Sequence, residues 1–189
     1  CYIGPGIRQY GNMLRATDCP GDLQANRCRI ANLRLTSGET AVHADMLEWN
    51  VAETAENAAR FVLSSVFGVI QYSVMLDFTR RHRETLLKGA FRPHHYEAFY
   101  PVIEAESAAE RIVAVYNDAA IADGGKVDRP IYILNATGSR RMAVLLSGGP
   151  ATGEIFDTFG VRRGVVALRA GLQEVAVPVS GYVRIAPDL

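Results

Sequence analysis

The sequence predicts an α/β region followed by an all-β region, as in the last βα units of a larger barrel joined to an antiparallel β-sandwich. Up to about residues 88–105, helical and strand-like segments alternate, which indicates βα units and a parallel sheet. After that point, short apolar runs follow one another with Gly or Pro between most of them, which is typical of a sandwich. We therefore predict two domains, residues 1–95 and 96–189.

Caps and periodicity define the elements of the first region. Asp22 and Asp77 stand where helix N-caps are expected, and Asn50 opens a segment that resembles a capping box. Gly89 ends the last helix. The three predicted strands are too few to close a barrel alone. In chain order the predicted elements are a strand over Asn12–Asp18, a helix over Leu23–Leu35, a strand over Thr40–Leu47, a helix from Asn50 to Phe67, a strand over Val69–Leu76 and a helix over Phe78–Leu87.

Short strands fill the second region. Several of them are rich in Val, Ile, Leu or Tyr, which favour strands, and turns such as Gly148–Pro150 separate them. This rhythm predicts the antiparallel sandwich. The predicted strands are Arg111–Asn117, Pro130–Asn135, Arg141–Ser147, Glu154–Phe159, Val165–Leu168, Glu174–Val179 and Tyr182–Ile185.

The composition indicates a globular protein with an ordinary core, because 49% of the residues are hydrophobic and 21% are charged. The net charge of zero gives no electrostatic footprint for nucleic acid or an anionic membrane, and it fits a neutral substrate. Polar residues interrupt the apolar run Phe61–Met75, so no membrane span is expected. Three cysteines without paired spacing argue against disulfides and metal binding, and unpaired thiols favour a cytoplasmic location. The first residue is Cys1, which favours a processed chain or a fragment.

Three motifs stand out when taken in order, namely Cys1-x-x-Gly4-Pro5-Gly6-x-Arg8, Thr17-Asp18-Cys19-Pro20-Gly21-Asp22 and Ala41-Val42-His43-Ala44-Asp45. They resemble motifs of the family 36 glycoside hydrolases, which include bacterial α-galactosidases. Cys1–Arg8 is similar to the family's Cys-x-x-Gly-Gly-Gly-Arg loop, Thr17–Asp22 to its Ser-Asp-Asn-Thr-Asp motif, and Ala41–Asp45 to its Gly-Ala-His strand. The helix with Arg81–Arg83 and the closing segment Gly181–Ile185 continue the resemblance. Departures such as Pro for Gly in the loop and Thr for Ser in the second motif leave the sugar specificity open.

The resemblance implies a TIM (β/α)8 barrel with a C-terminal β-sandwich, and an active site at the carboxyl ends of the barrel strands. It also implies retaining hydrolysis by two carboxylates. Asp18 matches the general acid/base, and the nucleophile would lie upstream of Cys1, so this segment alone is expected to be inactive. From the residue pattern alone, a helix-capping or loop role for Asp18 is favoured over a catalytic one, and only the resemblance favours catalysis.

The expected sugar contacts come from the same motifs. Cys1 and Gly4 match positions that contact galactose in the family. Arg15, three residues before Asp18, either donates hydrogen bonds to a sugar hydroxyl or forms a surface salt bridge. Other polar or aromatic residues are expected to be structural or solvated, namely Asp22, His43, Asp45, Trp49, His94 and His95.

The functional hypothesis is therefore part of a retaining exo-glycosidase that hydrolyses terminal α-galactosides of oligosaccharides or glycoconjugates, without cofactor or metal. An α-N-acetylgalactosaminidase or an α-galactosyl-transferring enzyme is a close variant. A non-catalytic carbohydrate-binding β module is the alternative from another class, although it leaves the segment Arg15–Asp18 unexplained. No nucleic-acid or membrane partner is expected, and a homo-oligomer remains open.

Overall fold

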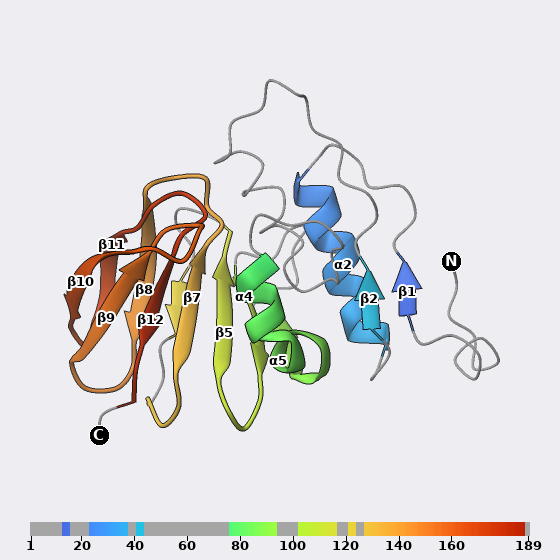
Figure 1. The fold of residues 1–189 in the computed structure, drawn as a ribbon, viewed down its shortest axis with the longest axis horizontal. Coiled ribbons are helices and arrows are strands. Elements are labelled where there is room, and N and C mark those ends of the chain that lie inside the picture. The colour runs from blue at the N-terminus through green and yellow to red at the C-terminus, as the bar shows by residue number, and fades with distance from the viewer. Residues whose placement is uncertain are drawn as a thin grey trace.

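The computed structural model describes residues 13–15, 23–37, 41–43, 76–93, 102–116, 121–123 and 127–187. Most of these residues belong to three layers, of which a mixed seven-stranded sheet is the middle one (Figure 1). Helices pack on one face of this sheet, and a three-stranded sheet packs on the other. No described helix combines the length and the apolar character needed to cross a membrane.

The first described elements form a parallel βαβ unit. Strand β1 (Met13–Arg15) pairs in parallel with β2 (Ala41–His43), and helix α2 (Leu23–Ser37) lies between them in sequence. The predicted helix over Leu23–Leu35 is thus confirmed and ends two residues later. Ile30 of α2 is buried in the same core as the helix-facing side of the seven-stranded sheet.

The predicted helix over Phe78–Leu87 is two short helices, α4 (Leu76–Arg81) and α5 (Arg83–Lys88). They meet at His82, whose N–H still donates to the Phe78 carbonyl at 3.0 Å. Gly89 follows α5 as predicted, and a Cβ there would collide with the backbone oxygens of Thr85 and Glu106. The helix end therefore needs glycine for close approach to the sheet rather than for its dihedral angles.

The seven-stranded sheet has the order β10-β9-β12-β7-β5-β4-β3. Neighbouring strands are antiparallel except β5 and β7, which are parallel. Strand β12 follows all the others in sequence, yet it lies between β9 and β7. The strands are β3 (Ala90–Pro93), β4 (Val102–Glu106), β5 (Arg111–Val115), β7 (Ile131–Asn135), β9 (Ala151–Phe156), β10 (Arg162–Leu168) and β12 (Tyr182–Ile185).

The smaller sheet contains β6 (Ile121–Asp123), β8 (Arg141–Leu146) and β11 (Gly171–Ala176), in the order β11-β8-β6. Its strands β6 and β8 are parallel. Alternate residues of both sheets meet in one apolar core, while the other residues of the seven-stranded sheet face the helices. Strands β5, β7 and β12 of the large sheet thus contribute residues to both cores.

The predicted fold class is wrong. The described chain is mostly β structure around a mixed sheet, and does not show the last units of a TIM (β/α)8 barrel followed by an antiparallel sandwich. The pairing of β5 with β7 is parallel because the chain crosses to the smaller sheet through β6 before it returns. Strands β3 and β4 pair across the expected boundary between residues 95 and 96, and the division into two domains stays a prediction.

Candidate functional site

Strand β12 carries two large side chains on the helix-facing side of the sheet. Tyr182 and Arg184 alternate with residues that are buried in the core between the sheets. On β9, Phe156 lies directly opposite Tyr182, and Glu154 lies opposite Arg184. On β7, Tyr132 is the other cross-strand neighbour of Arg184. The register of three adjacent strands therefore gathers aromatic and charged side chains at one place.

These side chains border a partly open cavity of about 620 Å³ between α4, the sheet and the turn after β9. Its volume is within the range of small-molecule sites, about 300–1,000 Å³. The wall combines aromatic rings with charged and hydroxyl groups. The lining residues are Asp77, Phe78, Arg81, His82, Tyr132, Phe156, Thr158, Phe159, Gly160, Tyr182 and Arg184.

Aromatic rings form a continuous wall in this cavity. Phe156 stacks on Tyr182 with ring centroids 4.9 Å apart and an interplanar angle of 12°. Phe78 lies 5.2 Å from Tyr182, and the His82 ring lies 4.3 Å from both Phe78 and Tyr132. Burial and the neighbouring Tyr132 raise the pKa of Tyr182 above its ordinary value, so this hydroxyl stays protonated. The wall thus presents ring faces together with a neutral hydrogen-bonding group.

His82 is held in place by a carboxylate. Its Nδ1 lies 2.6 Å from Oε2 of Glu110, and the two side chains are only 11% and 14% exposed. Burial acts to raise the pKa of Glu110, but hydrogen bonds from His82 and Thr85 outweigh it and keep that pKa below the ordinary value. Because Nδ1 faces Glu110, Nε2 is the ring nitrogen that can contact a ligand.

The charged groups of the cavity are paired but keep hydrogen-bonding capacity. Arg184 donates to Glu154 at 2.9 Å, and this hydrogen bond raises the pKa of Arg184. Glu154 also lies 3.5 Å from Arg162. On the opposite wall, Arg81 lies 3.8 Å from Asp77, in a pair whose side chains are about 70% exposed. A guanidinium has five N–H donors, so Arg184 retains donors for a ligand after it binds Glu154.

The turn after β9 is fixed by Asp157. Its Oδ1 accepts the N–H groups of Phe159 and Val161, both at 2.9 Å, and its Oδ2 accepts from Arg163 at 2.8 Å. Burial acts to raise the pKa of Asp157, but these hydrogen bonds hold it below the ordinary value. A second, more open cavity of about 510 Å³ lies across this turn. Phe159, which is 63% exposed, borders both cavities.

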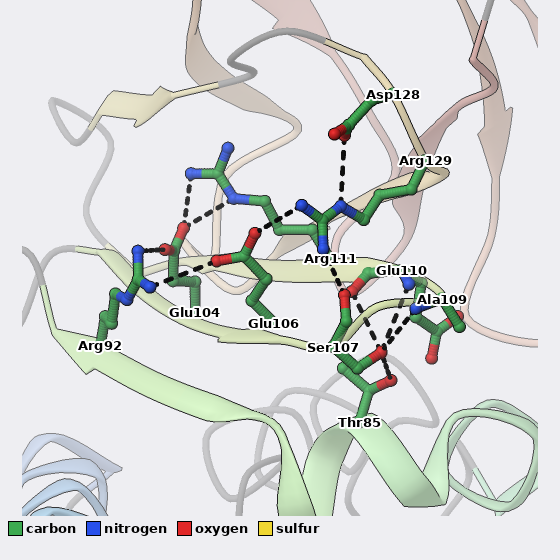
Figure 2. Close-up of polar contacts among 10 residues, drawn as sticks. All are labelled: Thr85, Arg92, Glu104, Glu106, Ser107, Ala109, Glu110, Arg111, Asp128 and Arg129. Atoms are coloured by element: carbon green, nitrogen blue, oxygen red, sulfur yellow. Dashed lines mark hydrogen bonds and ion pairs between the residues drawn. The ribbon is translucent and has the colours of Figure 1, made fainter.

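A separate cluster of charges lies on the other face of the sheet, at β3, β4 and β5 (Figure 2). Glu104 is 2% exposed and accepts two bonds from Arg111, at 2.5 and 2.8 Å. Glu106 lies 3.5 Å from Arg92 and 3.1 Å from Arg129. Arginines hold both carboxylates, so this cluster ties strands together and is a poor candidate for acid–base chemistry.

The sequence-predicted site residues lie outside the side chains that the structure describes, so their roles stay predictions. Asp18, Cys1 and Gly4 lie outside the described residues. Arg15 ends β1, but its side chain lies outside them too. Within the described ranges, no group of three or more His, Cys, Asp and Glu side chains has the arrangement of a metal site.

The residues that line the cavity come from four segments in which no site residue was expected, and two of these segments belong to the family resemblance. Arg81 and His82 belong to one segment of the family resemblance, and Tyr182 and Arg184 belong to another. About 100 residues of sequence separate these segments, so only the folded sheet shows that they meet. One sequence signal for this cavity was available. The predicted strand Glu154–Phe159 contains two phenylalanines, whereas the other predicted strands are mainly aliphatic.

Comparisons with protein-family models, with curated proteins and with solved structures find no match to this chain. The resemblance to family 36 glycoside hydrolases therefore stays a prediction from sequence motifs. The function has to be argued from the geometry of the cavity.

Proposed function

We propose that the aromatic cavity binds a carbohydrate, which makes this chain a sugar-binding module of a protein that acts on glycans. The observation that carries the proposal is the parallel stack of Phe156 on Tyr182 in the wall of a partly open cavity of about 620 Å³. One face of a pyranose ring presents weakly positive C–H groups. The face of an aromatic ring is electrostatically negative, so the two surfaces attract and both lose water.

The polar groups of the cavity complement the hydroxyls of a sugar. Arg184 and His82 supply nitrogen atoms, Asp77 supplies carboxylate oxygens, and all three line the same cavity as the aromatic rings. Sites of this kind are mainly apolar, with a few polar groups that fix the orientation of the ligand. A purely lipidic ligand would cover these polar groups without using their remaining hydrogen-bonding capacity, which is costly in a partly buried site.

Binding can be tested by titrating the protein with methyl α-galactoside and with α-linked galactose disaccharides, using calorimetry or amide NMR shifts. Phe159→Ala removes an exposed ring from the wall and Phe156→Ala removes half of the stack. Each should weaken binding about tenfold, the effect of roughly 1.4 kcal/mol of lost ring contact. Leu172→Ala is the matched control, because this exposed residue lies on β11 of the smaller sheet.

The proposal is supported if saturable binding weakens in both Phe variants and stays unchanged in Leu172→Ala. It is overturned if none of the sugars binds, or if binding is indifferent to the two rings.

A second candidate is the retaining α-galactosidase activity that the family resemblance implies, with Asp18 as general acid/base and the nucleophile upstream. The observation that favours it is the parallel pairing of β1 and β2 with α2 between them. This arrangement supports a site after β1, because ligands of α/β units bind beyond the carboxyl ends of parallel strands. Asp18 follows β1 in sequence and precedes α2.

Asp18→Ala in the intact enzyme tests this second candidate. Loss of an acid/base should lower activity about 10²–10⁴-fold on substrates with poor leaving groups. Activated aryl α-galactosides should still form the glycosyl-enzyme, and added azide should restore their turnover. An equal loss on all substrates without azide rescue rejects the acid/base role, and full activity rejects the assignment of the motif.

A further inference from the structure

The charges around the aromatic cavity do not balance. Two guanidinium groups, those of Arg81 and Arg184, line the cavity together with one carboxylate, that of Asp77. The pair of Asp157 and Arg163 beside the cavity adds one charge of each sign. The described groups thus leave one positive charge in excess. Outside the lining, Glu154 pairs with both Arg184 and Arg162, so this carboxylate is matched by the second arginine.

Arg184 lies where its guanidinium can donate hydrogen bonds to substituents on one edge of a stacked sugar. It is two residues after Tyr182 on the same face of β12, about 7 Å along the strand. A sugar ring that covers the Phe156–Tyr182 stack therefore directs substituents on one edge towards the Arg184 guanidinium. Since Glu154 is shared with Arg162, its charge is only partly available to neutralise Arg184.

We infer that the sugar bound in this cavity carries a carboxylate, as in a hexuronic acid; the inference rests on the proposed function. The carboxylate takes up the excess positive charge and accepts the remaining donors of Arg184, while the ring stacks on the aromatic wall. A planar carboxylate matches the fork of a guanidinium and forms stronger hydrogen bonds than a neutral hydroxyl does. A neutral hexose would satisfy the same stack but leave the charge unmatched.

The experiment compares methyl α-galacturonide with methyl α-galactoside, which differ only at the sixth carbon. The full chain is titrated with both sugars, as wild type and as Arg184→Gln. The acidic sugar should bind wild type at least about tenfold more tightly, the scale of a charge-assisted hydrogen bond. Arg184→Gln should remove most of this preference, because the acidic sugar loses more affinity than the neutral one. The preference should also fall as salt is added.

Two further variants keep the test decisive. Arg81→Gln removes a charge from an exposed side chain of α4, so it reports on the preference even if Arg184→Gln fails to fold. Arg141→Gln is the matched control, because Arg141 pairs with Glu174 on the smaller sheet, in a solvent-exposed ion pair outside the cavity.

The outcomes separate this inference from the proposed function. Equal binding of the two sugars, or a preference that survives in both cavity variants, overturns the inference and leaves sugar binding intact. The inference is also overturned if galactose 6-sulfate binds as tightly as the uronide. The site would then recognise any negative charge at the sixth carbon rather than a carboxylate. Failure of every sugar to bind overturns the proposed function itself.

Discussion

In the cluster around Glu104 the carboxylates and guanidiniums hold one another, whereas around the aromatic cavity they leave donors and ring faces open. Glu104 is almost fully buried and bound by Arg111 through two hydrogen bonds (Figure 2). Arg184 is paired too, but its side chain is 38% exposed and borders the cavity. A buried ion pair is costly to break by removing one partner, while charge at a cavity wall remains available to a ligand.

The largest effect is expected from Arg111→Ala. The free energy of unfolding should fall by about 3 kcal/mol, the lower end of the range for a broken buried pair, because Glu104 loses its close partner. Arg92 remains 4.0 Å from Glu104 and moderates the loss. Urea unfolding measures the change. Arg184→Gln, in which Glu154 keeps Arg162, should cost only about 0–1 kcal/mol.

The double variant Glu104→Leu with Arg111→Met sharpens the same comparison. Removing both charges should recover most of the stability lost in Arg111→Ala, because no buried charge is left unpaired. Similar losses in Arg111→Ala and Arg184→Gln would contradict the distinction between the two regions.

A variant of Asn135 compares the stability lost with a buried neutral side chain with the stability lost when the Glu104–Arg111 ion pair is broken. This fully buried side chain donates to the carbonyls of Ser139 and Val177, and its Oδ1 accepts from Thr137. Asn135→Ala should cost about 1–3 kcal/mol, because buried carbonyls lose their donors. Thermal and urea unfolding measure it. Gln173→Ala, which removes hydrogen bonds between exposed groups, is the control and should have a smaller effect.

The smallest effect is expected from Glu110, which makes the free energy of unfolding depend on pH in the acid range. Its folded-state pKa is lowered, so the stabilisation is fully present above the unfolded-state value of 4.5 and is lost as the pH falls through the lower folded-state pKa. The stability difference between wild type and Glu110→Gln should therefore shrink on acidification below that value. Thr85→Ala, which removes one of the two donors, should reduce this acid-sensitive contribution without abolishing it. Urea unfolding across this pH range checks both. A difference that does not change with pH would refute it.

Local patterns predicted several elements well. Strand β12 has the predicted bounds Tyr182–Ile185, and α2 begins at the predicted residue. These bounds are predictable because they depend on residues within or next to the element itself. Strand β4 was missed because Glu104 and Glu106 occupy every second position and make the segment look solvent-exposed. Glu104 is buried and both carboxylates pair with arginines from other segments, and no local pattern reveals such partners.

Tertiary arrangement could not be predicted in the same way. The parallel pairing of β5 with β7 depends on where the chain crosses between the sheets, and the prediction of an antiparallel sandwich failed there. The cavity depends on the register of β12 against β9, which brings Tyr182 onto Phe156. The expected acid/base Asp18 lies outside the described residues, and its role stays a prediction.

The central place of β12 also has a consequence for biosynthesis. The ribosome releases residues 182–185 after every other strand of the large sheet. Until then, the β9–β10 hairpin and the strands β3, β4, β5 and β7 lack the strand that joins them, so they remain two separate parts with open edges. The nascent chain therefore exposes aggregation-prone edges throughout its translation, and final folding awaits the last strand. Truncation before residue 182 should leave a product that depends on chaperones, although every core strand but one is present.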